Sequence, residues 1–186
     1  HLPVQSGSSR LLEMMNRGYT REWYIDRIAA IKRIIPDCGI STDTISGFCS
    51  ESDEDHAETL SLMELVKYDF SYMFAYSERP KTLAERKFKD DVPEEVKKRR
   101  LQDIVDLQQK HSAIRTKEGV GKIHKVLIEG VSKKSKEQYF GRNSQNTVVV
   151  FPKENYKVGE FVMVKITDCT AATLIGEAVG YSEIMN

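Results

Sequence analysis

The chain has 186 residues, 40% of them hydrophobic and 30% charged. This composition is typical of a globular protein, and the length allows one full domain or two small ones. No run approaches the roughly 18 consecutive apolar residues of a transmembrane helix, so the sequence predicts no membrane partner. Three widely spaced cysteines, odd in number, favour a reducing, cytoplasmic compartment over a disulfide framework.

The formal net charge is zero, but the charge is unevenly distributed. Residues 1–79 hold 8 basic and 13 acidic side chains, residues 80–118 hold 11 and 8, and residues 119–186 hold 9 and 7. A basic second half is weak evidence for a polyanionic partner. Ordinary solvated faces are the simpler explanation of so small an excess.

Strand-like and helix-like patterns alternate over the first 90 residues. Strands are expected at 1–7, 41–48 and 70–76, the last with aromatic residues on one face. A short helix ending at Gly18, a second helix from Thr20 to Gly39 and a third helix before residue 67 separate them. This alternation predicts βαβ units with parallel strands. Functional residues gather at the carboxyl ends of such strands, where Gln5, Asp43 and Tyr76 are expected.

An acidic run at residues 52–55 has two interpretations. Ser52 followed three residues later by Asp55 has the spacing of a capping box at a helix start. The same carboxylates could hold a metal ion, but the helix dipole already accounts for acidic residues there. We therefore expect a helix cap.

A charged connector at residues 80–92 leads into a long helix that begins near Pro93. His111 lies on this helix and is expected to be a packing or surface residue rather than a catalytic one. Gly119 and Gly121 end the helix and mark a domain boundary.

From Lys122 the hydrophobic period changes to two. Strands are expected at 122–128, 148–151 and 161–166, with a weaker candidate at 174–179. Several short strands in under 70 residues indicate a small antiparallel barrel. The candidate phosphate contacts are Lys125, Lys133, Lys134, Lys136 and Arg142, and Tyr139 or Phe140 could stack on a base. The alternative is a basic solvated rim over a core aromatic residue.

Several stretches together resemble one family, the methylthiotransferases of the radical S-adenosylmethionine superfamily. They are residues 1–8, 15–20, 41–43 with 47–48, 76–77 with 79–80, and 92–95. The resemblance implies that residues 1–90 are the C-terminal half of a (β/α) barrel, residues 91–118 a linker helix, and residues 119–186 a TRAM domain, a small β-barrel that binds RNA. It also implies an unpaired outer edge at residues 1–4, which we expect to be covered by a neighbouring chain or poorly ordered.

The tail separates two substrate classes within this family. Lys133-Lys134, Gly141-Arg142, Asn146 and residues 148–152 resemble the branch that adds a methylthio group to isopentenyl-adenosine beside the tRNA anticodon. The branch that modifies a ribosomal protein usually has an acidic run here, and none is present. The implied partner is the tRNA anticodon stem-loop. A ribosomal-protein methylthiotransferase and a non-catalytic RNA-binding module remain the alternatives.

Family members use S-adenosylmethionine and two 4Fe-4S clusters, one of them bound through a CxxxCxxC motif. This sequence has no such motif, and Cys38, Cys49 and Cys169 are too far apart to replace it. The chain also opens with His1 in strand-like sequence. We therefore expect a fragment that holds no cluster and is inactive by itself.

The resemblance carries over some cofactor-binding residues. In related enzymes a Gln after the fourth strand, an Arg on the next helix and an Asp on the fifth strand contact S-adenosylmethionine. Gln5, Arg17 and Asp43 match in type and order. Arg17 suits the methionine carboxylate, and the other two suit ribose hydroxyls; Arg17 could instead neutralise a helix C-terminus. Ser6 and Ser8 are further candidates near the same edge.

Overall fold

The computed structural model describes residues 1–181 and divides the chain into two compact units, His1–His111 and Ser112–Asn186. Each unit has its own hydrophobic core. The domain boundaries expected at residues 90 and 118 remain predictions. In the described residues, no helix is long and apolar enough to cross a membrane.

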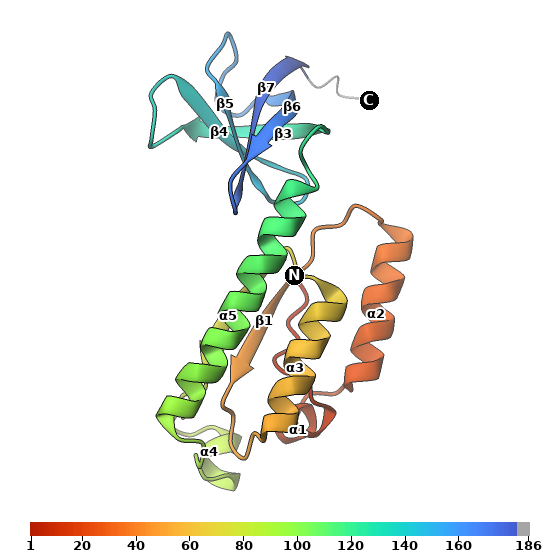
Figure 1. Cartoon of the computed structure of the whole chain (residues 1–186), viewed down its shortest axis with the longest axis vertical. Helices are drawn as coiled ribbons and strands as arrows, with labels where there is room; N and C mark the ends of the chain where they lie inside the picture. The colour runs from red at the N-terminus through yellow and green to blue at the C-terminus, as the bar shows by residue number, and fades with distance from the viewer. Residues whose placement is uncertain (182–186) are drawn as a thin grey trace. The chain divides into compact units, whose positions relative to one another are not determined.

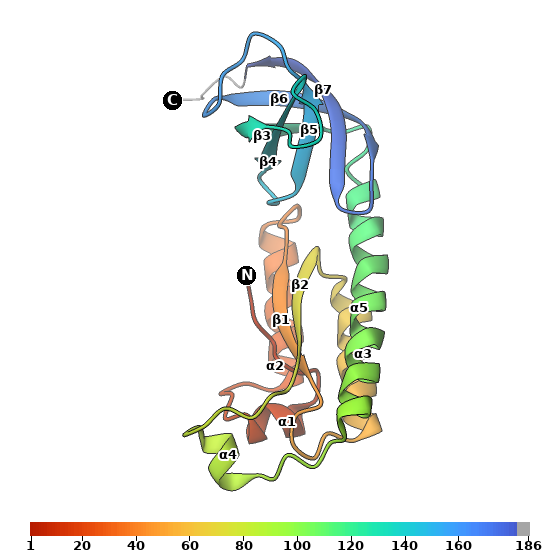
Figure 2. The same ribbon diagram turned by 90° about the vertical axis from the view of Figure 1, so that its left-hand side faces the viewer.

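The first unit is an α/β structure, as the alternating patterns predicted (Figure 1). Strands β1 (Ser41–Ser46) and β2 (Phe70–Ala75) pair in parallel, with Asp43 opposite Tyr72. The helices are α1 (Ser9–Met14), α2 (Arg21–Ile34), α3 (Asp53–Val66), α4 (Leu83–Lys87) and the first part of α5 (Glu94–Lys117). Helices α3 and α5 lie on the same side of the two strands (Figure 2), and α2 packs into the same core. The opposite side of β2 exposes about half of each ring of Phe70, Tyr72 and Phe74.

Residues 1–5 lie beside β1 but do not form the regular strand expected there. Leu2 N donates to Ser41 O at 2.8 Å and Gln5 N to Asp43 O at 2.9 Å, while Pro3 has no N–H to donate. The Leu2 carbonyl accepts hydrogen bonds from the Tyr24 hydroxyl at 2.8 Å and from Thr42 Oγ1 of β1 at 2.9 Å. The Tyr19 hydroxyl reaches the next two carbonyls, at 3.1 and 3.3 Å. Tyrosine hydroxyls therefore satisfy carbonyls of this segment. No described strand pairs with its outer side, so the unpaired edge expected at residues 1–4 stays a prediction.

Helix boundaries follow the predicted caps at their starts better than at their ends. The Thr20 side chain accepts a hydrogen bond from Trp23 N, and Ser52 and Asp55 form the predicted capping box. Helix α1, however, ends at Met14, where Asn16 rather than Gly18 takes the left-handed conformation. Helix α2 ends at Ile34, well before Gly39.

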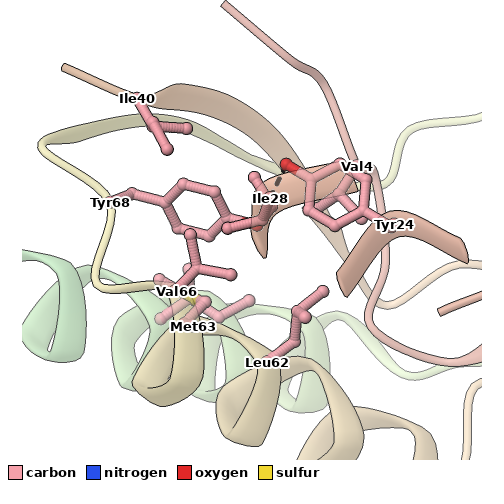
Figure 3. Close-up of a cluster of buried hydrophobic side chains, with 9 residues drawn as sticks. Val4, Tyr24, Ile28, Ile40, Leu62, Met63, Val66 and Tyr68 are labelled. Atoms are coloured by element: carbon pink, nitrogen blue, oxygen red, sulfur yellow. Dashed lines mark hydrogen bonds between the residues drawn. The ribbon is translucent and has the colours of Figure 1, made fainter. Parts of the chain in front are cut away.

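The core of the first unit gathers side chains from the N-terminal segment, α2, α3 and α5 (Figure 3). Tyr24 and Ile28, four residues apart, form the buried face of α2. Trp23 and Ile34 of the same helix lie outside that face and are 45% and 71% exposed. The hydroxyl of the fully buried Tyr68 donates to the Tyr24 hydroxyl at 3.1 Å. This bond satisfies a polar group inside the core.

The second unit contains a closed five-stranded barrel with strand order β3-β4-β5-β7-β6. Its strands are β3 (Ile123–Val131), β4 (Gln138–Asn143), β5 (Val148–Pro152), β6 (Phe161–Cys169) and β7 (Thr173–Tyr181). Strand β4 was not expected, and β5 pairs with β7 in parallel rather than antiparallel. Alternating residues fill the interior, which confirms the period-two prediction of a small barrel.

Candidate functional site

A cavity of about 310 Å³ lies beside the carboxyl ends of β1 and β2. It is lined by ten residues: Met14, Met15, Asn16, Arg17, Ile45, Phe48, Tyr76, Thr82, Leu83 and Ala84. The lining is mostly apolar, with one cation, and the volume is at the lower end of the range for small-molecule sites. The position agrees with the rule that ligands bind where parallel strands end.

Arg17 is the candidate cofactor residue that lines this cavity. It follows the turn after α1, and its backbone N–H donates to Leu12 O at 2.8 Å. The guanidinium is exposed and makes no hydrogen bond or ion pair with another described residue. Its five donors are therefore available to a carboxylate or phosphate.

Asp43 lies in the middle of β1 rather than at its end. Its half-buried carboxylate is 3.3 Å from His1 Nε2, beside Tyr72 of β2. Because side chains alternate along a strand, Asp43 and the cavity-lining Ile45 lie on the same face of β1. Gln5 forms an isolated parallel bridge with Thr44, at φ 71°. Gln5 and Asp43 are thus brought together by backbone pairing.

Ser6 and Ser8 do not fit direct cofactor contact, because both are at most 1% exposed. The Ser8 hydroxyl donates to Asp55 Oδ1 at 2.6 Å, and the Ser6 hydroxyl lies 3.4 Å from Thr59 Oγ1. Both serines therefore join the N-terminal loop to α3. Burial raises the pKa of Asp55, but hydrogen bonds from Arg10, Ser8 and the capping serine outweigh it and hold this pKa well below its usual range.

One wall of the cavity joins Tyr76, which was expected at a strand end, to Phe48, which was not singled out as a site residue. The ring of Phe48 meets Tyr76 edge-on at 4.9 Å, and the Lys97 ammonium lies 5.5 Å from the Tyr76 ring centroid. Burial raises the pKa of Tyr76 to about 12, and it also raises the pKa of the Cys49 thiol. Both groups are therefore protonated near pH 7. The glycine and aromatic pair directly after β1 was the available sequence signal for this wall.

The described residues contain no group of three or more His, Cys, Asp or Glu side chains placed to hold a metal ion. Cys38, Cys49 and Cys169 are free thiols. A 4Fe-4S cluster needs several thiolates at one place, so these cysteines do not fit one.

The basic candidates in the barrel are solvent-exposed. Lys133, Lys134 and Lys136 lie in the loop between β3 and β4, and Lys125 lies on β3. Arg142 lies on β4, with Nε 3.5 Å from Glu129 and Nη1 donating to Asn146 O at 2.9 Å.

Tyr139 does not fit the stacking role, because its ring belongs to the barrel core and is only 5% exposed. Its hydroxyl donates to Tyr156 O at 2.7 Å, which anchors the ring from inside. Phe140, on the opposite face of β4, packs against Gly130. The exposed ring nearest to a candidate lysine is instead Phe161, whose centroid lies 4.7 Å from Lys125 Nζ.

Comparison with known families finds two domain matches. Residues 1–63 match the radical SAM superfamily model, and residues 117–179 match the TRAM domain model. A solved solution structure of a conserved Methanococcus maripaludis protein aligns over 32% of this chain and 79% of its own, with 28% identity and a TM-score of 0.27. That score is too low to support any argument.

Among curated proteins, several relatives named tRNA-2-methylthio-N(6)-dimethylallyladenosine synthase align over nearly the whole chain. The protein from Christiangramia forsetii is 64% identical over 98% of this chain, and the one from Flavobacterium johnsoniae is 62% identical over 99%. The Phocaeicola vulgatus protein is 60% identical over 96%. The chain spans 38%, 38% and 39% of these relatives' lengths, respectively. With a radical SAM superfamily match at residues 1–63 and a TRAM domain match at residues 117–179, the chain is homologous over nearly its whole length to these methylthio-adding synthases.

Proposed function

We propose that this chain is part of a tRNA methylthiotransferase that acts on isopentenyl-adenosine beside the anticodon. It would form one side of the S-adenosylmethionine site and bind the RNA. The observation that carries the proposal is 64% identity over 98% of the chain to a relative of that name. Since tRNA is the proposed substrate, we place the activity in the cytoplasm. The substrate contact is the anticodon stem-loop.

The cavity beside β1 and β2 is the proposed part of the S-adenosylmethionine site that this chain supplies. Arg17 would pair with the methionine carboxylate, and Asp43 and Gln5 would bond ribose hydroxyls. When bound and reduced by one electron from a 4Fe-4S cluster held outside this chain, S-adenosylmethionine would supply the radical that removes hydrogen from the adenine ring. A second molecule would supply the methyl group for the inserted sulfur. The apolar wall of Phe48 and Tyr76 limits the access of water to this part of the site.

The two 4Fe-4S clusters of the full-length protein would be held by residues outside this chain, since its own cysteines do not fit one. By itself the chain is therefore proposed to be inactive. The barrel would bind tRNA through Lys125, Lys133, Lys134, Lys136 and Arg142, and salt would weaken this binding.

A chimaera tests the proposal. The segment of the Flavobacterium johnsoniae synthase that aligns with this chain is replaced by this chain, and the chimaera is expressed in a strain that lacks its own synthase. Mass spectrometry of digested tRNA is expected to detect the methylthio mark on isopentenyl-adenosine. An Arg17→Ala chimaera is expected to give less of it, and Arg27→Ala, whose guanidinium lies over Trp23, serves as the control. A folded chimaera that leaves tRNA unmarked would contradict the proposal.

A further inference from the structure

The outer face of the barrel carries an exposed aromatic ring beside a cation. Strands β3 and β6 pair so that Leu127 lies opposite Phe161, and Lys125 lies opposite Met163. The alternate residues of both strands are buried in the barrel core, so these four side chains lie together on the outer face.

Phe161 is the aromatic residue of this group of four. The residue is 43% exposed, while Leu127 and Met163 beside it are half-buried. Lys125 Nζ lies 4.7 Å from the ring centroid, in the range of a cation–π contact. An exposed ring with a cation over it has the two elements of a stacking platform for a nucleobase.

Further cations lie in line with this ring. Arg142 of β4 is opposite Leu127, so Arg142, Leu127 and Phe161 form one row across three strands. Lys165 of β6 lies on the same face. Two carboxylates also lie there: Glu129 is 3.5 Å from Arg142, and Glu177 is opposite Lys165. The excess charge is positive, which suits a phosphate backbone passing over an aromatic ring.

We propose that Phe161 is a stacking site for an unpaired RNA base, with Lys125 and Arg142 contacting the flanking phosphates. The proposal deepens the RNA-binding role proposed for the barrel and rests on it. A protein that added a strand would need an open sheet edge, and the closed barrel has none. A protein that covered the face as a dry apolar patch would have to bury three cations, at a high desolvation cost.

The test measures binding of two labelled single-stranded RNAs to the 186-residue chain by fluorescence anisotropy. One RNA is an oligoadenylate, and the other has the same phosphates without bases. The wild type is expected to prefer the oligoadenylate. Phe161→Ala is expected to weaken oligoadenylate binding roughly 5- to 100-fold, with little change in its salt dependence or in binding of the abasic RNA. Lys125→Ala is expected to weaken the binding of both RNAs and to reduce the slope of log affinity against log salt concentration by about one.

Two further variants guard against misfolding. Phe161→Leu keeps an apolar side chain without the aromatic face, and it is expected to lose most of the preference for the base-bearing RNA. Val158→Ala shortens a side chain of a residue that is 56% exposed, in the loop before β6. It is expected to leave the affinity for both RNAs unchanged. If the wild type binds both RNAs equally, or folded Phe161→Ala binds as the wild type does, the stacking site is wrong while RNA binding stands. If the wild type binds neither RNA at low salt, the RNA-binding role fails and the stacking site fails with it.

Discussion

The ammonium of Lys97 lies 5.5 Å from the ring centroid of Tyr76 and 2.6 Å from Asp90, although the lysine is only 1% exposed. A buried lysine needs such partners, because burial disfavours its charged form. The hydrogen bonds that Lys97 donates to Asp90 and Glu94 outweigh that burial and raise the pKa of Lys97. The aliphatic part of Lys97 fills the space beside Gly47, which has φ +73° and no room for a Cβ atom. One side chain thus joins α5 to the loop after β1 and to the cavity wall.

We expect Lys97→Met to destabilise the first unit by about 1–3 kcal/mol. Removing one partner of a buried ion pair leaves the other unpaired, and the partial exposure of Asp90 reduces the loss. Urea unfolding measures this. Lys98→Met, at the exposed neighbouring position, is the matched control and is expected to be near neutral. Equal effects of the two substitutions would contradict the role of Lys97.

We expect Tyr24→Phe to cost about 1–3 kcal/mol of unfolding free energy. The hydroxyl donates to Leu2 O and accepts from Tyr68, so its loss leaves two core polar groups without this partner. Tyr72→Phe removes a hydroxyl from a residue that is 53% exposed and is expected to have little effect. A neutral Tyr24→Phe, measured by the same denaturation, would show that the hydroxyl relay adds no stability.

Acid should weaken the attachment of the N-terminal loop to α3. The pKa of Asp55 is lower in the folded chain than in the unfolded one, because hydrogen bonds from Arg10 and serine residues outweigh burial. The unfolded chain therefore binds more protons, and stability present above about pH 4 is lost as the pH falls below it. We expect Asp55→Asn to lose about 1–3 kcal/mol at pH 7 and to show less further loss between pH 5 and pH 3. Glu54→Gln, exposed in the same turn, is expected to keep the wild-type profile.

Arg17 should contribute to cofactor affinity through the methionine carboxylate. In the chimaera described above, we expect Arg17→Ala to weaken S-adenosylmethionine binding about 10- to 100-fold, the usual effect of removing a charge-assisted hydrogen bond. Arg17→Lys should be intermediate. Titration calorimetry with decarboxylated S-adenosylmethionine provides the control, because its binding should depend little on Arg17. Equal losses for both ligands would place Arg17 in a structural role.

Local sequence signals predicted the order and type of most elements. Apolar alternation, one continuous apolar run and a weaker candidate segment predicted four of the five barrel strands. Short polar residues before acidic turns predicted the helix starts at Thr20 and Ser52. Strand β4 was missed because Gly141, Arg142 and Asn143 read as a turn. Tyr139 and Phe140 are adjacent, so one must face inward and the other outward. Only pairing with β3 and β5 fixes which one is buried.

The cofactor candidates show the same limit. Ser6 and Ser8 are short polar residues in a turn, which usually indicates exposure. Their burial depends on Thr59 and Asp55 of α3, about fifty positions away in the sequence. Lys97 reads as one of several charged residues at the start of a helix. Its packing against Gly47 is again non-local, so no local pattern could reveal it.

The closed ring of strands in the barrel also has an evolutionary consequence. Every strand is hydrogen-bonded on both sides, so the barrel has no open edge to which a partner could add a strand. Recognition must then depend on the side chains that project from β3, β4 and β6. Such residues can be exchanged one at a time without disturbing the hydrogen-bonded strands beneath them, so the outer surface of the barrel can change in sequence while its backbone stays the same.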